Sequence, residues 1–131
     1  MPTEHVPVRI YATAEAASAV VAREIADLIA HRNAEGRRTV LGLATGHTPL
    51  HVYRELARAH AEEGLDFSNV VTFNLDEYWP IDPSDLQSYH AWMHENLFRH
   101  VNIPAEQIHI PSGTVPEAEI AAHCAAYEKA I

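Results

Sequence analysis

Two short stretches of the sequence combine residue types that can bind and transform a small polar molecule. The first, GLATGHTPLHVY, runs from Gly42 to Tyr53 through a Thr-Gly-His-Thr turn; the second, NLDEY, runs from Asn74 to Tyr78 and holds two adjacent acids. Hydroxyls and backbone N–H groups bind oxyanions, and a carboxylate beside a bound substrate can act as a general base. The two stretches therefore direct attention to sites for anionic metabolites.

The turn in the first stretch has the features of an anion site at the start of a helix. Pro49 predicts a helix with Thr48 as N-cap and Pro49 at the first helical position, so that free N–H groups face the turn. Gly46 permits close backbone approach, Thr45 and Thr48 offer hydroxyl donors, and His47 offers an N–H or a ring contact. A helix cap without a ligand explains this segment equally well, because the P-loop lysine and the GxGxxG spacing are lacking.

The second stretch offers a base. Neighbouring side chains of an extended chain point in opposite directions, so at most one of Asp76 and Glu77 faces a given ligand while the other orients or packs. We expect Asp76 to face it, because a carboxylate beside a phosphate-holding turn could remove a proton next to a carbonyl. Two solvated loop acids are the alternative, and it is the commoner case for acidic pairs.

The histidines and the cysteine do not form a recognisable reactive motif. His90 and His94 share a helical spacing, but the zinc-protease pattern HExxH requires an acid where this sequence has Ala91. We therefore expect no metal. Cys124 lies in the helical segment AAHCAAYEKA without a local positive partner, which predicts a packed or partly exposed thiol rather than a nucleophile.

The spacing of apolar residues predicts alternating strands and helices that would position these groups. Strands are expected at Val8–Tyr11, Thr39–Ala44, Asn69–Leu75 and Ile108–Ile110. Helices are expected at Ala14–His31 after an N-cap at Thr13, from Pro49 onward, at Ser88–His100, and after a capping box at Thr114–Glu117 through Tyr127. The first helix should bury one apolar face made by Ala17, Val20, Val21, Ile25, Leu28 and Ile29. The second of these helices should have one apolar face, made by Leu50, Tyr53, Leu56 and Ala57.

Strands that alternate with helices predict an α/β fold with a mostly parallel sheet, right-handed crossovers and helices on both faces. Such sheets bind ligands beyond the carboxyl ends of their strands, which is where both the turn and the acid pair fall. The two features should therefore share one edge of the sheet.

The composition of the chain limits the kinds of partner that the protein is expected to bind. The 131 residues, 47% of them hydrophobic, suffice for one packed domain, and a net charge of −9 argues against nucleic acid and anionic membrane surfaces. No apolar run reaches the roughly 20 residues that a membrane-spanning helix needs. The single cysteine excludes an internal disulfide, and the start MPTEHVPVRI lacks the pattern of a secretory signal, so a soluble cytoplasmic protein is expected.

Taken together, LGLATGHTPLHVY, VVTFNLDEY, SYHAWMHENLFRHVNIP and IHIPSGTVP, in this order between Val40 and Glu117, closely resemble the amino-terminal half of glucosamine-6-phosphate deaminases. The resemblance implies a Rossmann-like three-layer fold that the deaminases share with 6-phosphogluconolactonases and relatives of ribose-5-phosphate isomerase. It also implies that residues 1–131 form the amino-terminal part of such a domain, which would be incomplete here.

The same resemblance assigns roles to individual residues. The family's TG(S/G)TP turn receives the sugar 6-phosphate, which carries over to Gly46, His47 and Thr48, although His47 replaces the usual small residue. The Asp of the family's DEY motif is its proton-transfer base and corresponds to Asp76, while Tyr89 is a weaker candidate for lining the sugar pocket. Thr45 and Glu77 complete the expected set of substrate-binding residues.

The implied reaction converts glucosamine 6-phosphate and water to fructose 6-phosphate and ammonia, with no redox cofactor. The chain lacks the family's second catalytic segment, which ends in Asp-Gly-His and is followed by Ala-Phe-Asn-Glu-Pro, and the later basic residues of its phosphate site. The 131 residues alone are therefore expected to be inactive. The alternatives are a 6-phosphogluconolactonase-like hydrolase, whose family usually shows DER at the position of DEY, and a sugar-phosphate-binding module without catalysis. A homo-oligomer is expected.

Overall fold

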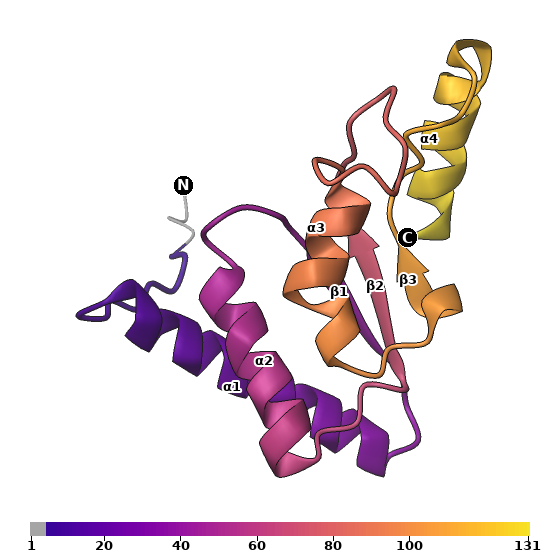
Figure 1. Cartoon of the computed structure of the whole chain (residues 1–131). Coiled ribbons are helices and arrows are strands. Elements are labelled where there is room, and N and C mark those ends of the chain that lie inside the picture. The colour runs from indigo at the N-terminus through magenta and orange to yellow at the C-terminus, as the bar shows by residue number, and fades with distance from the viewer. Residues whose placement is uncertain (1–4) are drawn as a thin grey trace.

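A three-stranded parallel sheet organises the chain, whose residues 5–131 are described by a computed structural model (Figure 1). The strands are β1 Thr39–Leu43, β2 Val70–Asn74 and β3 Ile108–His109, in the order β1-β2-β3. Both pairings are parallel. The expected α/β class is confirmed, and three of the predicted strands are present with ends shifted by one residue.

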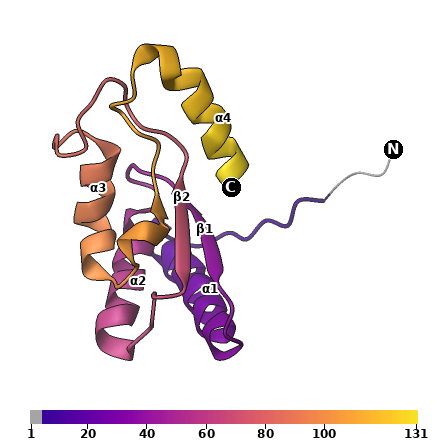
Figure 2. The ribbon, with the colours of Figure 1, turned by 90° about the vertical axis from the view of Figure 1, so that its right-hand side faces the viewer.

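Helices flank both faces of this sheet. The α-helices are α1 Ala14–Ala34, α2 Leu50–Glu63, α3 Tyr89–Asn96 and α4 Ile120–Ala130, and short 3₁₀ turns cover Phe98–His100, Ala105–Gln107 and Glu117–Glu119. Figure 2 shows α2 and α3 on one side of the sheet and α4 on the other. No helix within residues 5–131 combines the length and the apolar character needed to cross a membrane.

The core lies between the sheet and the helices of the α2 side. Alternation along β2 places Val70, Thr72 and Asn74 on the same face, and all three are buried. The buried apolar residues in contact there come from every layer: Ala22, Ala26, Ile29, Leu43, Tyr53, Leu56, Phe67, Val70, Met93, Leu97, Phe98 and Ile103. On the opposite face, the ring of Phe73 stacks on His109 and meets Tyr127 of α4 edge to face. A firm core thus supports both strands that lead to the predicted site.

Helix α1 buries only part of the face that the sequence predicted. Thr13 is the N-cap as predicted, since its hydroxyl accepts from the N–H of Ala16 at 3.1 Å. Of the predicted residues, Ile29 is buried and Ile25 packs against the core, whereas Val21 and Leu28 are each 41% exposed. The rest of the buried stripe consists of the small residues Ser18, Ala22 and Ala26. Small side chains let two helices approach closely, and α1 uses this stripe to pack on α2.

The strand predicted at Val8–Tyr11 is absent, because these residues are in neither helix nor strand. Val6, Val8 and Ile10 alternate as strand residues do but are 78%, 75% and 91% exposed. A strand needs a neighbour to pair its N–H and C=O groups, and no described residue serves as that neighbour. Figure 2 shows this segment leading away from the body of the fold.

Two of the predicted helix boundaries are wrong. The helix expected at Ser88–His100 ends at Asn96, because Leu97 has φ −142° and ψ −60° and breaks the helical path before the 3₁₀ turn. The capping box at Thr114 does not form: the Thr114 hydroxyl lies 3.1 Å from that of Ser112. Pro116 instead begins a 3₁₀ turn, and α4 starts only at Ile120.

Candidate functional site

The carboxyl ends of β1 and β2 bring the two predicted stretches together. Leu43 pairs with Asn74 at the last register position, so the segments that follow leave the sheet side by side at one edge. The side-chain amide of Asn74 donates to the carbonyl oxygen of Leu43 at 3.4 Å and ties the two ends. This edge, made by residues 44–48 and 75–78, is called the rim below. The expectation that both features share one edge is confirmed.

The turn at the rim presents free backbone donors. Gly46 has a φ of +97°, a conformation that glycine adopts readily and other residues rarely do. Within residues 5–131, the N–H groups of Gly46, His47 and Thr48 donate to no protein acceptor, and all three residues are exposed. Thr45 is half-buried. Three consecutive unpaired N–H groups next to the start of α2 are suited to an oxyanion.

The helix after the turn begins one residue later than predicted. Leu50 is its first residue and Pro49 takes the N-cap position, with φ −84° and ψ −6° and no side-chain capping bond. The N-cap role proposed for Thr48 is therefore wrong. Because proline has no N–H and its backbone already has helical angles, the chain enters the helix through Pro49, and the Thr48 hydroxyl is left without a capping role.

Sequence reasoning missed the residue that holds the start of the turn. The hydroxyl of Tyr53 donates to the carbonyl of Ala44 at 2.5 Å and accepts from its N–H at 3.1 Å. Tyr53 is 3% exposed, and burial raises the pKa of its phenol to about 12, although the bond with the Ala44 backbone acts in the opposite direction. The phenol is therefore neutral at ordinary pH. Apolar spacing identified Tyr53 as a core residue but carried no signal for this contact.

We expect Tyr53→Phe to lower the free energy of unfolding by about 1–2 kcal/mol, because one hydroxyl serves two backbone groups. Urea unfolding at pH 7 measures this, with Tyr11→Phe as the control from the segment outside helices and strands. The difference in the free energy of unfolding between the wild-type protein and Tyr53→Phe should shrink as pH rises from 10 to 12. The phenol of the unfolded chain ionises near its ordinary pKa of 10.0, whereas the folded one resists until about 12. A difference that is independent of pH would contradict this assignment.

The two acids of the second stretch face different surroundings, as alternation required. Asp76 is exposed at the rim, whereas the side chain of Glu77 is 1% exposed. The carboxylate of Glu77 accepts from the N–H groups of Tyr78, Tyr89 and His90 and from Nδ1 of His90. Glu77 therefore lies turned into the protein at the start of α3, and Asp76 is the acid left open to a ligand.

Two tyrosines stand next to the acids. The ring centroids of Tyr78 and Tyr89 lie 4.8 Å apart, and the planes of the two rings form an angle of 43°. The pKa of the Tyr78 phenol is raised above its ordinary value, first by the adjacent Tyr89 phenol and to a lesser degree by the negative charges of Asp76 and Glu77. The half-buried Tyr89 thus packs against Tyr78, and its role in lining a sugar pocket stays a prediction.

The loop that follows the acids is fastened to the turn after β3. The indole N–H of Trp79 donates to the carbonyl of Val115 at 2.8 Å, and the N–H of Ile81 donates to that of Gly113 at 2.9 Å. A Cβ atom at position 113 would lie 2.5 Å from the side chain of Ile81 and 2.7 Å from the carbonyl oxygen of Tyr78. These contacts join segments far apart in sequence, and nothing in the sequence signalled them.

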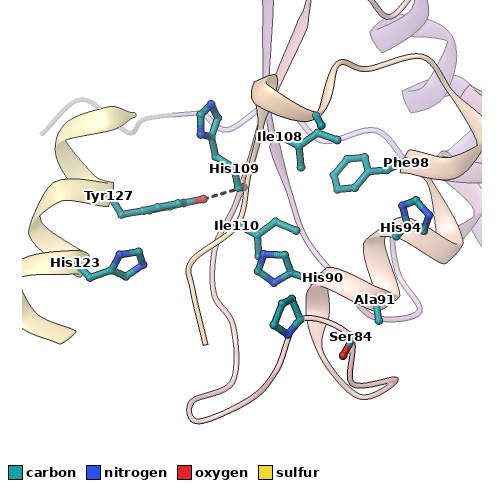
Figure 3. A pocket seen from close by; sticks show the side chains of 12 residues that line it. Ser84, His90, Ala91, His94, Phe98, Ile108, His109, Ile110, His123 and Tyr127 are labelled. Carbon is teal, nitrogen blue, oxygen red and sulfur yellow. Dashed lines mark hydrogen bonds between the residues drawn. The ribbon is translucent and has the colours of Figure 1, made fainter. Parts of the chain in front are cut away.

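A cavity of about 720 Å³ lies between α3, β3 and α4 (Figure 3). Its walls combine apolar groups such as Phe98 and Ile110 with histidines, and none of the predicted site residues lines it. His123 accepts from the N–H of Ser112 at 3.0 Å, and Tyr127 donates to the carbonyls of Asn74 and His109, so part of this polar lining is committed to holding the fold.

Metal ligands were not expected, and the described residues contain no group of three or more His, Cys, Asp or Glu side chains placed to hold an ion. His90 is engaged by Glu77 through Nδ1 at 2.7 Å. Cys124 is free and exposed on α4.

Known proteins share both the sequence and the fold of this chain. Glucosamine-6-phosphate deaminase 2 of Giardia intestinalis is 55% identical over 108 residues, which is 79% of this chain and 40% of the relative. A monomeric glucosamine-6-phosphate deaminase of known structure matches with a TM-score of 0.87 and 38% identity, over 95% of this chain and 49% of that one. A 6-phosphogluconolactonase from Thermotoga maritima gives a TM-score of 0.66 and 25% identity over 86% of this chain and 48% of that one.

These matches support the Rossmann-like fold and account for the resemblance in the motifs. The chain spans only about 40% of the length of the Giardia relative. The family model for glucosamine-6-phosphate isomerases/6-phosphogluconolactonase matches residues 12–131, nearly all of the chain. The protein therefore belongs to the glucosamine-6-phosphate isomerase/6-phosphogluconolactonase family.

Proposed function

We propose that this chain is the amino-terminal part of a glucosamine-6-phosphate deaminase, with residues 1–131 contributing the phosphate turn and the base. The observation that carries the proposal is the rim, where the free N–H groups of Gly46, His47 and Thr48 lie beside the exposed carboxylate of Asp76. A phosphate held by the turn would fix the substrate, so that the reacting carbons remain beside the base.

The chemistry assigned to the rim is a proton transfer between adjacent carbons. Asp76 would take the proton from C2 of the opened sugar and return it at C1. Because the aldehyde oxygen gains a proton and the amine nitrogen loses one in the same conversion, the amino aldehyde becomes an imine at C2 with a hydroxyl at C1. Water then adds to this imine, and ammonia leaves to give fructose 6-phosphate. Thr45 would add a hydroxyl contact to the phosphate, and Tyr89 would line the sugar. We propose that the protein acts in the cytoplasm on this small molecule and assembles as a homo-oligomer.

A lactonase is the second candidate because it shares the fold. The deaminase is favoured by 38% identity to the monomeric deaminase, against 25% to the Thermotoga lactonase, and by the DEY sequence at Asp76–Tyr78. A non-catalytic sensor would bind the sugar phosphate at the same turn and release nothing. An assay of ammonia release from glucosamine 6-phosphate, run beside lactone hydrolysis, separates the three candidates when applied to a protein of full family length that carries this chain.

Binding at the turn is testable on the 131-residue chain itself. Titration with fructose 6-phosphate should shift the backbone amide signals of Gly46, His47 and Thr48 in a saturable way, because their N–H groups are free to bind the phosphate. Inorganic phosphate should shift the same signals at higher concentration. Saturable shifts elsewhere with these three signals unchanged would show that the turn is not the phosphate site.

A further inference from the structure

We infer that Glu77 is a positioning residue, whose buried carboxylate joins the loop between β2 and α3 (residues 75–88, called the acid loop below) to the start of α3 and thereby keeps Asp76 at the rim. The inference rests on the proposed function, since it concerns how the proposed base is held. The alternation of side chains predicted that Glu77 orients or packs, whereas the resemblance to the family placed it among the substrate contacts. Its burial and its partners assign it a different task.

The partners of Glu77 come from two elements. One oxygen, Oε1, accepts from the N–H of Tyr78 at 2.9 Å and from the N–H of Tyr89 at 2.8 Å. The other, Oε2, accepts from the N–H of His90 at 3.0 Å and lies 2.7 Å from its ring nitrogen Nδ1. Tyr78 belongs to the acid loop, whereas Tyr89 and His90 are the first residues of α3. One side chain thus spans the loop and the helix.

The contact satisfies groups that would otherwise lack partners. The first N–H groups of a helix have no acceptor within the helix, and a negative charge at that end is favourable. Ser88 supplies the usual N-cap bond to the N–H of Ala91 at 3.0 Å, and Glu77 serves the two N–H groups before it. The ring of His90, 34% exposed, forms part of the wall of the cavity in Figure 3 and shields the carboxylate from that side.

The charge of Glu77 persists at neutral pH. Burial alone would raise the pKa of its carboxyl, but the bonds from Tyr89, His90 and Tyr78 outweigh this effect and bring the pKa below its ordinary value of 4.5. A lowered pKa in the folded state stabilises the fold above the ordinary value and loses this effect as pH falls through the folded value. The connection is therefore intact throughout the range in which Asp76 would act.

The position of Asp76 depends on the hydrogen bonds between Glu77 and the start of α3. It precedes Glu77 directly, and alternation sends the two side chains to opposite sides. With Glu77 fixed at α3, and with Trp79 and Ile81 bonded to the turn at residues 113–115, the backbone on the carboxyl side of Asp76 is held at several points. Loss of the Glu77 carboxylate should therefore misplace the base without altering the phosphate turn, which belongs to β1 and α2.

The test is Glu77→Gln in a protein of full family length that carries this chain. Glutamine preserves the size but turns an NH₂ group toward two of the four donors, so that at least one pair of bonds is lost. We expect kcat to fall by about 10–100-fold while KM changes by less than about threefold. Glu95→Gln is the matched control, because Glu95 is an exposed acid of α3 whose side chain, among residues 5–131, pairs only with Arg99 across one turn. It should change neither constant.

Two further measurements separate positioning from general stability. If Glu77 acts through Asp76, the double variant Glu77→Gln/Asp76→Asn should have a kcat no lower than that of Asp76→Asn alone.

A third variant, His90→Leu, removes only the ring contact and should lower kcat by less than Glu77→Gln does. If Glu77→Gln fails to fold, His90→Leu tests the inference in its place. In the 131-residue chain, folded Glu77→Gln should move the amide signals of Tyr89 and His90 while those of Gly46 to Thr48 stay in place.

Each outcome decides the matter. Wild-type kcat in a folded Glu77→Gln protein, or in His90→Leu where Glu77→Gln does not fold, would overturn the inference. So would rate losses that multiply in the double variant, since they indicate independent roles. If the wild-type protein released no ammonia while the amides of Tyr89 and His90 still moved, the proposed function would fail and the connection between loop and helix would stand by itself.

Discussion

Asp76→Asn is expected to remove most deaminase turnover from a protein of full family length that carries this chain. Asparagine has the shape of aspartate but cannot take up the C2 proton, so kcat should fall by about 10²–10⁴-fold, the usual effect of losing a positioned general base. Substrate binding should be largely preserved, because Asp76 is exposed at the rim and the turn that would hold the phosphate is separate from it. Steady-state rates of ammonia release at varied substrate concentration give kcat and KM.

The control for this variant is Asp27→Asn, which makes the same chemical change at an exposed acid of α1. It should leave kcat and KM within about twofold, as surface substitutions away from special features do. Near-parental turnover in Asp76→Asn would mean that another group takes the proton, and the base would have to be sought among other residues of the rim.

The 131-residue chain by itself is expected to fold but to release no measurable ammonia from glucosamine 6-phosphate. Folding follows from the shared core of the sheet and α1, α2 and α3, which includes the fully buried Ile29, Leu56 and Phe67. Catalysis requires a proton donor for the leaving amine in addition to Asp76, and the family resemblance places that donor in a histidine segment that these residues lack. The chain also spans about 40% of the length of the Giardia relative.

Binding to the isolated chain should be weak for a related reason. Charge-assisted contacts contribute about 1.5–3 kcal/mol each, so a phosphate site that lacks two of the family's later basic residues should lose a hundredfold or more in affinity. The exposed Val6, Val8, Ile10 and Val40 add a tendency to self-associate, which size-exclusion chromatography would register. Ammonia release by the purified chain, beside a protein of full family length, is the decisive assay. Clear turnover by the short chain would mean that one of its own histidines, such as His47 or His90, donates the proton.

The sequence predicted the parts of this fold that depend on local pattern. The runs TVLGL and VVTFN form strands because they are short, apolar and rich in branched residues, and VVTFN is mostly buried whereas Val40 and Gly42 of the first run are exposed. The parallel order of β1 and β2 then places the turn and the acids at one edge. The opposite directions of Asp76 and Glu77 also follow from strand geometry alone. These inferences needed no knowledge of which residues touch.

What the sequence did not predict depends on partners distant along the chain. Periodicity marks Tyr53 as buried, but only the folded turn shows that its hydroxyl meets Ala44. No local sequence pattern around Tyr89 and His90 predicts that their N–H groups donate to Glu77, an acid more than ten residues earlier in the chain. The missing strand at Val8–Tyr11 has the same origin, because alternation indicates a preference for extended structure and cannot supply the neighbour that a strand requires.

The close packing at Gly113 limits how this protein can be recombined with its relatives. Since even a methyl group there would collide with Ile81, the turn after β3 and the loop after Asp76 must match each other as a pair. A chimera that joins two family members between residues 81 and 113 takes the loop after Asp76 from one parent and the turn after β3 from the other. If the second parent has a residue other than glycine at position 113, its side chain would collide with the loop. Exchange points before β2 or within α4 keep the pair from a single parent, and the segment from Val70 to Val115 is therefore the natural unit for transplanting this part of the candidate site.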